Sequence, residues 1–314
     1  MNDRMALEVR ALTKRYGSTT AVDRLTFSVG AGTIYGLLGP NGAGKTTTLE
    51  CIEGLRAPDD GSIGVFGIDP TTHPKELWST IGVQLQESAL PKTMTPKEAV
   101  VFFSRYHKVE PRLDLLDRFG LAAHADKQYG AMSVGQRRRL SLALSVAHGP
   151  ALVLLDEPTA GLDVESRVEL HEMMRELRRG GTTIVLSTHD MAEAEKLCDR
   201  IGIIIAGRLA IEGTPQQVTA AGDRRTKIRV ASMQGTIRAD APALAGAEPA
   251  NGSAEAHDDD GYAAYWSDRP ADSVTAILDY LKRNNDELVD LRVERPSLEE
   301  RFVEITTAAH GGTR

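Results

Sequence analysis

The sequence has no long hydrophobic run. Within its 314 residues, the most apolar stretches lie at 152–155 and 201–206, and both are far shorter than the roughly 20 residues that a membrane-spanning helix needs. Residues 1–7 are polar and charged, so we expect no signal peptide there. These absences predict a cytoplasmic chain whose role at a membrane depends on a partner.

Cysteine and positive charge are scarce as well. Cys51 and Cys198 form neither a CxxC motif nor a spacing typical of metal ligands, so we expect two reduced, buried side chains. The formal net charge of -7 argues against a nucleic-acid partner, which would need Lys and Arg concentrated on one face. Docking to a membrane protein stays open, because that depends on a local patch.

What the sequence does contain is an alternation of short apolar strands and helices over residues 1–220. Continuous apolar strands that alternate with helices predict an α/β fold, with a mainly parallel sheet flanked by helices. A mostly helical stretch predicts a helical subdomain at about 88–150. The expected strands are 7–9, 26–29, 33–38, 151–155, 183–187 and 201–206, and the expected helices are 46–55, 166–178 and 191–197.

The composition shifts after residue 215. Residues 240–261 are rich in Ala, Gly, Pro and Asp, which is typical of a flexible surface loop. Ser297 and Glu300 have the spacing of a capping box and predict a last helix that starts after Pro296. We therefore predict a small α+β accessory domain over 221–314. Its other expected elements are strands at 227–233, 262–267 and 289–293 and a helix around 274–281.

Residues 39–46 read GPNGAGKT and match the phosphate-binding P-loop pattern between a predicted strand and a predicted helix. The glycines let backbone N–H groups point at the phosphates, and the start of the following helix attracts the same anion. Lys45 places a positive charge on the phosphates, and the Thr46 hydroxyl can bind Mg²⁺.

Residues 152–157 read LVLLDE, an apolar strand that ends in two carboxylates. Side chains at the carboxyl end of a parallel strand emerge beside the ligand crevice. We expect Asp156 to hold Mg²⁺ and Glu157 to act as the general base on an attacking water.

With these two motifs in the same order, residues 1–220 resemble an ABC (ATP-binding cassette) ATPase. Residues 132–136, MSVGQ, are similar to the family signature LSGGQ, with Met132 and Val134 as departures. In the family the signature begins a helix and caps the γ-phosphate bound to the opposite subunit. His189 resembles the switch histidine, and Gln86 resembles the glutamine that touches Mg²⁺ and senses the transport partner, although Gln84 lies close to it.

The resemblance implies roles for individual residues. The catalytic residues would be Glu157, His189 and Lys45. Mg²⁺ would be held by Thr46, Gln86 and Asp156. ATP would contact Tyr16, Val22, Gly39, Pro40, Asn41, Gly42, Ala43, Gly44, Lys45, Thr46, Thr47, Ser133, Gly135, Gln136 and Asp163. Of these, Tyr16 matches the aromatic residue that stacks on adenine, and Asp163 belongs to the segment called the D-loop.

The tail narrows the resemblance to one branch of the family. Residues 295–302, RPSLEERF, are similar to ATPase subunits of the daunorubicin-resistance type, which energise drug exporters whose permease is a separate chain. The resemblance implies a homodimer that binds ATP and Mg²⁺, docks on a transmembrane permease at the cytoplasmic face and drives multidrug or antibiotic efflux.

Two alternatives remain open at this point. The first is an ABC ATPase that moves lipid, ion or other cargo, because the permease selects the cargo. The second is a soluble ABC ATPase that acts on ribosomes or DNA, although the chain has neither a second cassette nor long heptad repeats. A purely regulatory nucleotide-binding protein is disfavoured, because Glu157 and His189 are both present.

Overall fold

The computed structural model describes residues 4–85, 90–221, 226–237, 247–249, 262–294 and 297–311. The chain divides into two compact units, the first comprising Met1–Pro215 with Ile305–Arg314 and the second Gln216–Glu304. In the described part of the chain, no helix is both long and apolar enough to cross a membrane.

A six-stranded sheet forms the centre of the first unit, in the order β5-β6-β7-β3-β8-β9. Its first five strands are parallel, and β9 pairs antiparallel with β8. The central strands are buried along their whole length, which explains their continuous apolar sequences. The strands are β3 (Ile34–Leu38), β5 (Ile81–Gln84), β6 (Leu152–Asp156), β7 (Thr183–Thr188), β8 (Arg200–Ile205) and β9 (Arg208–Gly213).

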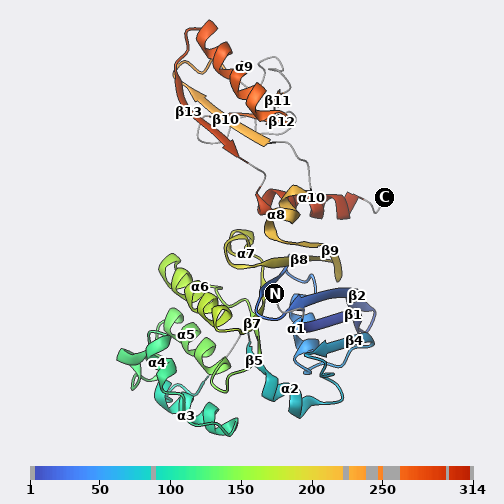
Figure 1. Cartoon of the computed structure of the whole chain (residues 1–314), viewed down its shortest axis with the longest axis vertical. Helices are drawn as coiled ribbons and strands as arrows, with labels where there is room; N and C mark the ends of the chain where they lie inside the picture. Colours follow the sequence, from blue (N-terminus) through green and yellow to red (C-terminus); the bar gives the residue numbers. More distant parts are fainter. Residues whose placement is uncertain are drawn as a thin grey trace. The chain divides into compact units, whose positions relative to one another are not determined.

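Helices cover both faces of this sheet (Figure 1). On one face, α1 (Lys45–Ile52) packs between the six-stranded sheet and a second, antiparallel sheet in the order β2-β1-β4. The other face carries α5 (Val134–Ser145), α6 (Val164–Arg179) and α7 (Met191–Leu197). A Cβ on Gly82 would lie 1.9 Å from the Ser145 carbonyl oxygen, so only glycine lets α5 approach β5 this closely. The second sheet consists of β1 (Met5–Tyr16), β2 (Thr19–Gly30) and β4 (Asp60–Val65).

Among its described residues, the stretch that the sequence predicts to be helical contains helices joined by turns and no strand. Its first long helix, α3, begins with a complete capping box between Thr95 and Glu98. α1 ends at Ile52, three residues earlier than expected, because Gly54 adopts a left-handed conformation with φ 74°. The elements of this region are α3 (Pro96–Tyr106), α4 (Asp114–Arg118), η1 (Ala122–His124), η2 (Tyr129–Ala131) and α5, and α2 (Pro74–Thr80) precedes β5 outside it.

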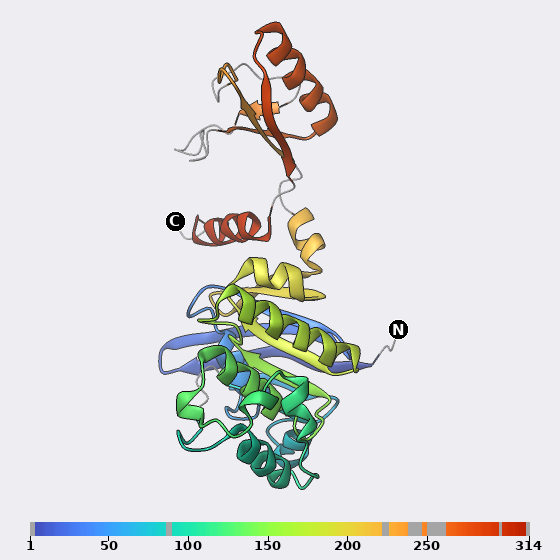
Figure 2. The same ribbon diagram turned by 90° about the vertical axis from the view of Figure 1, so that its left-hand side faces the viewer.

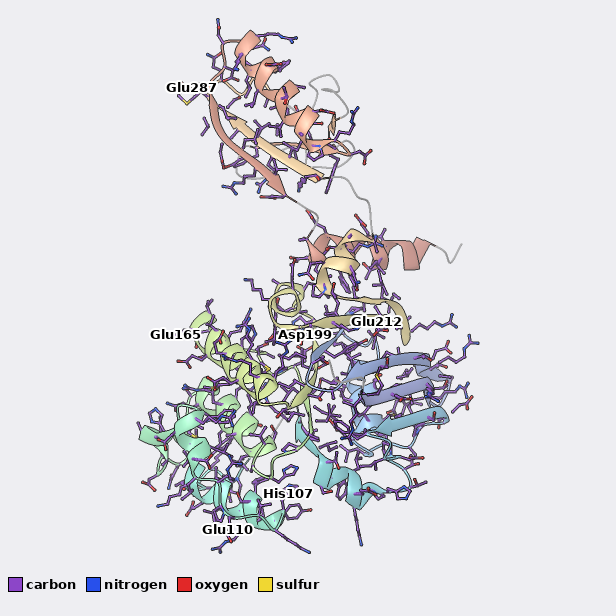
Figure 3. The ribbon with its side chains drawn as sticks, in the orientation of Figure 1. His107, Glu110, Glu165, Asp199, Glu212 and Glu287 are labelled. Carbon is purple, nitrogen blue, oxygen red and sulfur yellow. The ribbon has the colours of Figure 1, made fainter. Side chains whose placement is uncertain are left out.

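The second unit is a small α+β fold with its own core. Its antiparallel sheet has the order β11-β12-β10-β13, and the helix α9 covers one face through Ile277 and Leu281 (Figure 2). Residues 247–249 pair with β12 as a strand, within the segment expected to be a loop. Glu287 lies in the turn between α9 and β13 (Figure 3). The elements are α8 (Pro215–Ala220), β10 (Thr226–Ser232), β11 (Ala247–Pro249), β12 (Ala263–Ser267), α9 (Pro270–Arg283) and β13 (Leu288–Glu294). The last helix, α10 (Leu298–Gly311), begins in this unit, and its residues from Ile305 onward belong to the first unit.

Candidate nucleotide-binding site

The glycine-rich loop joins the carboxyl end of β3 to the first residue of α1. Gly44 caps α1 with φ 104°, and a Cβ there would lie 2.4 Å from the Ala21 carbonyl oxygen. A Cβ on Gly39 would approach the Ile204 carbonyl oxygen equally closely, at 2.4 Å. Glycine is therefore required at both ends of the loop, at Gly44 for its conformation and at both positions for space.

Lys45 folds back over this loop. Its Nζ donates hydrogen bonds to the carbonyl oxygens of Gly39 at 2.8 Å and Pro40 at 3.3 Å, and it lies 3.7 Å from Glu157 Oε1. Burial lowers the pKa of Lys45, while the negative charges of Glu157 and Asp156 oppose that shift. The lysine thus occupies the loop through carbonyl oxygens whose place a phosphate could take.

Asp156, at the end of β6, connects the loop to the sheet. Its Oδ2 accepts a hydrogen bond from Thr46 Oγ1 at 3.0 Å, and its Oδ1 accepts one from Ser187 Oγ. Mg²⁺ is commonly held by one or two protein oxygens together with substrate phosphates and waters. A hydroxyl and a carboxylate beside the phosphate loop suit this pattern, although the described residues contain no cluster of three metal-ligating side chains.

Glu157 and His189 meet at the same edge of the sheet. Glu157 has φ 47°, and its N–H donates to Ser187 at the carbonyl oxygen and at Oγ. Its Oε2 lies 2.9 Å from His189 Nδ1. The Glu157 side chain is only 10% exposed, whereas that of His189 is 60% exposed. The carboxylate is therefore fixed by its surroundings, and the imidazole reaches it from the surface.

A cavity of about 480 Å³ lies over the loop. Its lining includes Tyr16, which is 40% exposed at the end of β1, with the Arg56 guanidinium 5.4 Å from the centre of its ring. Val22 is fully buried in the core, and Ala21 lines the cavity instead. Sequence reasoning missed Ala21. The complete lining is Tyr16, Ala21, Asn41, Gly42, Ala43, Gly44, Lys45, Thr46, Thr47 and Glu157, so Gly39 and Pro40 lie outside it.

The signature residues do not line this cavity. Ser133 is the N-cap of α5 and forms a capping box with Gln136. A Cβ on Gly135 would lie 2.7 Å from Ser166 Oγ on α6. Val134 is 54% exposed, so this departure from the family pattern leaves no packing defect. The structure therefore brings the P-loop, Glu157 and His189 together, but not the signature.

Asp163, Gln84 and Glu53 do not line this cavity either. Asp163 is the N-cap of α6, and hydrogen bonds from the Ser166 N–H and hydroxyl hold its pKa below the usual range. Gln86 lies outside the described residues, and Gln84 is buried at the end of β5. Burial, followed by the charges of Asp156 and Glu50, raises the pKa of Glu53 to about 7. Sequence reasoning gave Glu53 no role.

Comparisons with known proteins agree with this geometry. The sequence profile of the ABC transporter family matches residues 22–160. The daunorubicin resistance ATP-binding protein DrrA2 of Streptomyces coeruleorubidus is 37% identical over 97% of this chain and 96% of its own length. The Nod factor export ATP-binding protein I of Burkholderia orbicola is 41% identical over 67% of this chain and 71% of its own length.

Among solved structures, cbiO1 of Clostridium perfringens, part of the ABC transporter complex cbiONQ, is 27% identical with a TM-score of 0.63. That match covers 69% of this chain and 92% of the other. The chain belongs to the ABC transporter family, as one of its ATP-binding subunits. It is an ATPase with the P-loop ABC fold, which confirms the expected fold class, activity and ATP binding.

Proposed function

We propose that this ATPase lies at the cytoplasmic face of the cell membrane, where it docks on a separate transmembrane permease and energises the export of drugs or antibiotics. The observation that carries this proposal is the extent of the match to DrrA2, whose name gives daunorubicin resistance, over 97% of this chain. The Nod factor export relative aligns with only 67% of it. The similarity to the resistance protein thus extends through the accessory region at 221–314, for which we propose a regulatory or docking role.

In the proposed mechanism, Lys45 leaves the carbonyl oxygens of the loop and binds the phosphates of ATP. Thr46 and Asp156, together with Gln86, would hold Mg²⁺, which supplies positive charge that offsets the charge developing on the transferred phosphoryl group. The attacking water forms a bond to the γ-phosphorus, the bond from that phosphorus to ADP breaks, and ADP leaves. Glu157 accepts the proton of the water, because its carboxylate is buried and lines the cavity beside Lys45.

His189 orients Glu157 through the bond of 2.9 Å between Nδ1 and Oε2. We further propose that Tyr16 stacks on adenine, since its ring lies at the rim of the cavity and is half-exposed.

The site is completed by a second copy of the chain. Ser133, Gly135 and Gln136 lie at the start of α5, outside the cavity of their own subunit. We propose that they contact the γ-phosphate bound by the partner copy, with the helix N-terminus directed at the anion. Asp163 would lie at the same interface, where its carboxylate holds the first turn of α6 in place.

A second cavity, of about 530 Å³, supports the docking of a permease. It is lined mainly by apolar and aromatic side chains from α2, β5, α3 and α5, including Trp78, Phe103 and Tyr106. Leu85 and Leu90, which flank the segment 86–89 that contains Gln86, also line this cavity. His107 directly follows α3 (Figure 3). Its ring stacks on that of His148 in the same lining, with ring centres 3.8 Å apart. An apolar helix of the permease would fit this surface.

The test is co-expression with a candidate permease, taken from the reading frame beside this gene if that frame encodes a membrane protein. We expect the permease to move the chain to the membrane fraction, to raise ATP turnover and to lower cellular accumulation of a fluorescent anthracycline. Phe103→Ala should abolish the stimulation by the permease while ATP affinity stays unchanged. Phe102→Ala, on the neighbouring exposed residue outside the lining, is the matched control. Full turnover without any membrane partner would contradict the proposal, and stimulation without drug efflux would reassign the cargo.

A further inference from the structure

The two residues beside His189 are tied down by hydrogen bonds. Thr188 Oγ1 donates to Glu193 Oε2 at 2.8 Å and accepts from the Asp190 N–H at 3.0 Å. Asp190 Oδ1 accepts from the Glu193 N–H at 2.9 Å and so caps α7, while its Oδ2 accepts from Arg167 Nη1 at 2.9 Å. The backbone on both sides of His189 is therefore fixed to neighbouring helices.

Glu193 is a fully buried carboxylate that the proposed chemistry does not use. Its side chain has no exposed surface, and that of its partner His171 is 8% exposed. Oε1 lies 2.9 Å from His171 Nε2, and Oε2 accepts the Thr188 hydroxyl. A buried carboxylate is costly unless its oxygens are satisfied, and here both oxygens have a partner. Burying the Glu193 carboxylate costs desolvation free energy that an apolar side chain at this position would not cost, so its hydrogen bonds, and not packing, account for its presence.

Two chains of hydrogen bonds link the neighbours of His189 to α6. One runs from Thr188 through Glu193 to His171, and the other runs from Asp190 to Arg167. Both end on the same face of α6. Arg167 and His171 are four residues apart on this helix, so their side chains emerge one above the other towards α7. Two labelled residues locate these helices in Figure 3. Glu165 lies in the first turn of α6, and Asp199 lies two residues after the end of α7. The helix begins at its cap Asp163, and Gly135 of the signature packs against its first turn at Ser166.

We propose that Glu193, His171 and Arg167 are positioning residues that hold His189 against Glu157 by fixing Thr188 and Asp190 to α6. The His189 side chain is 60% exposed, so packing around the ring cannot fix its position, and the restraint comes from the backbone on either side. The proposal rests on the proposed role of His189. In this arrangement α6 connects the two ATP sites of the dimer. Its first turn packs against Gly135, which would contact the ATP of the partner copy, and its connections to Thr188 and Asp190 hold His189 at the subunit's own ATP.

The test compares steady-state turnover and ATP affinity of the full-length chain. Thr188→Val keeps the shape of the side chain but removes the hydroxyl, and it should lower kcat about tenfold, as expected for a loss of about 1.4 kcal/mol in the transition state. KM for ATP should stay within about twofold of wild type, because the ATP contacts are intact. Thr188→Ser restores the hydroxyl and should recover most of the turnover.

Arg167→Met, which cuts the second and more exposed connection, should lower kcat in the same way. The matched control is Arg175→Met on the same helix. Arg175 pairs with exposed Glu172 and bonds to the Lys196 carbonyl oxygen, and we expect wild-type kcat from this variant. Thermal melting and binding of a fluorescent ATP analogue establish that each variant is folded.

The His189→Ala variant separates this inference from the proposed function. Its kcat should be low, and adding Thr188→Val should lower it no further, because both changes act through the same imidazole. If His189→Ala alone hydrolyses ATP normally, the proposed function of His189 is wrong. If His189→Ala is impaired but Thr188→Val and Arg167→Met are both as fast as wild type, the positioning role is wrong.

Discussion

Replacing Glu157 by Gln removes one negative charge from between Lys45 and His189 while keeping the size of the side chain. The Glu157 carboxylate lies 3.7 Å from Lys45 Nζ, and its Oε2 lies 2.9 Å from His189 Nδ1. Both members of the Lys45–Glu157 pair are nearly buried. The substitution therefore changes the electrostatics of the site and removes its proposed proton acceptor at the same time.

These two effects have opposite consequences for binding and turnover. At an effective dielectric constant of about 20, the Coulomb attraction between Lys45 and Glu157 is about 4.5 kcal/mol before the cost of desolvation. Glutamine gives up this attraction, so Lys45 is freer to bind phosphate and ATP affinity should stay the same or increase. Glutamine cannot accept a proton, and general base catalysis contributes about 10²- to 10⁴-fold. We therefore expect kcat to fall by about that factor.

The assay measures hydrolysis of radiolabelled ATP in parallel with equilibrium binding. Size-exclusion chromatography with Mg²⁺ and ATP should show that the Glu157→Gln chain accumulates as an ATP-bound dimer, because the closed state no longer decays by hydrolysis. Glu165→Gln, on an exposed position in the first turn of α6, controls for the loss of one surface charge. Turnover of Glu157→Gln near the wild-type rate would refute the assignment of the base.

Three further predictions follow from single features of the structure. Gly44→Ala should abolish ATP binding and lower stability by about 2 kcal/mol or more in thermal unfolding, because its φ of 104° and its approach to the Ala21 carbonyl exclude a side chain; normal binding would contradict this. Burial, and then the neighbouring His107, lower the pKa of His148 to about 4. Since the unfolded value is about 6.5, the unfolded chain takes up a proton that the native chain does not, so stability should decrease from pH 6.5 to pH 4, and less so in His148→Asn. Truncation after Pro215 should leave ATP binding measurable, and its loss in a folded truncation would place the tail in the site.

The sequence allowed the P-loop and both carboxylates to be located because their chemistry requires a strand, a turn and a helix in direct succession. Glycine at Gly39 and Gly44, and acidic residues at the end of an apolar strand, identify such places without knowledge of tertiary structure. Val22 illustrates the limit of this approach. Successive side chains of an extended strand point to opposite sides, so Ala21 lines the cavity and Val22 points into the core. The motif does not show which of the two sides faces the cavity.

The network behind His189 could not be predicted. His171 and Glu193 are 22 residues apart, and neither belongs to a recognisable motif. Their contact depends on how α6 and α7 pack on the sheet, which periodicity alone does not determine. The strand at 247–249 was missed for a similar reason, since its pairing with β12 overrides a local composition typical of loops.

The central claim is that the P-loop of one copy and the signature of another form one catalytic site. Its direct test mixes two inactive full-length chains, Lys45→Ala and Ser133→Arg, and measures ATP hydrolysis after mixed dimers have been demonstrated by differential tagging. Each mixed dimer has one site with an intact P-loop and an intact signature. Because about half of randomly paired dimers are mixed, we expect up to about a quarter of wild-type turnover. A mixture of Lys45→Ala with Glu157→Gln, in which no site is intact, should remain inactive. If the first mixture is as inactive as this control although mixed dimers are present, the shared site is wrong.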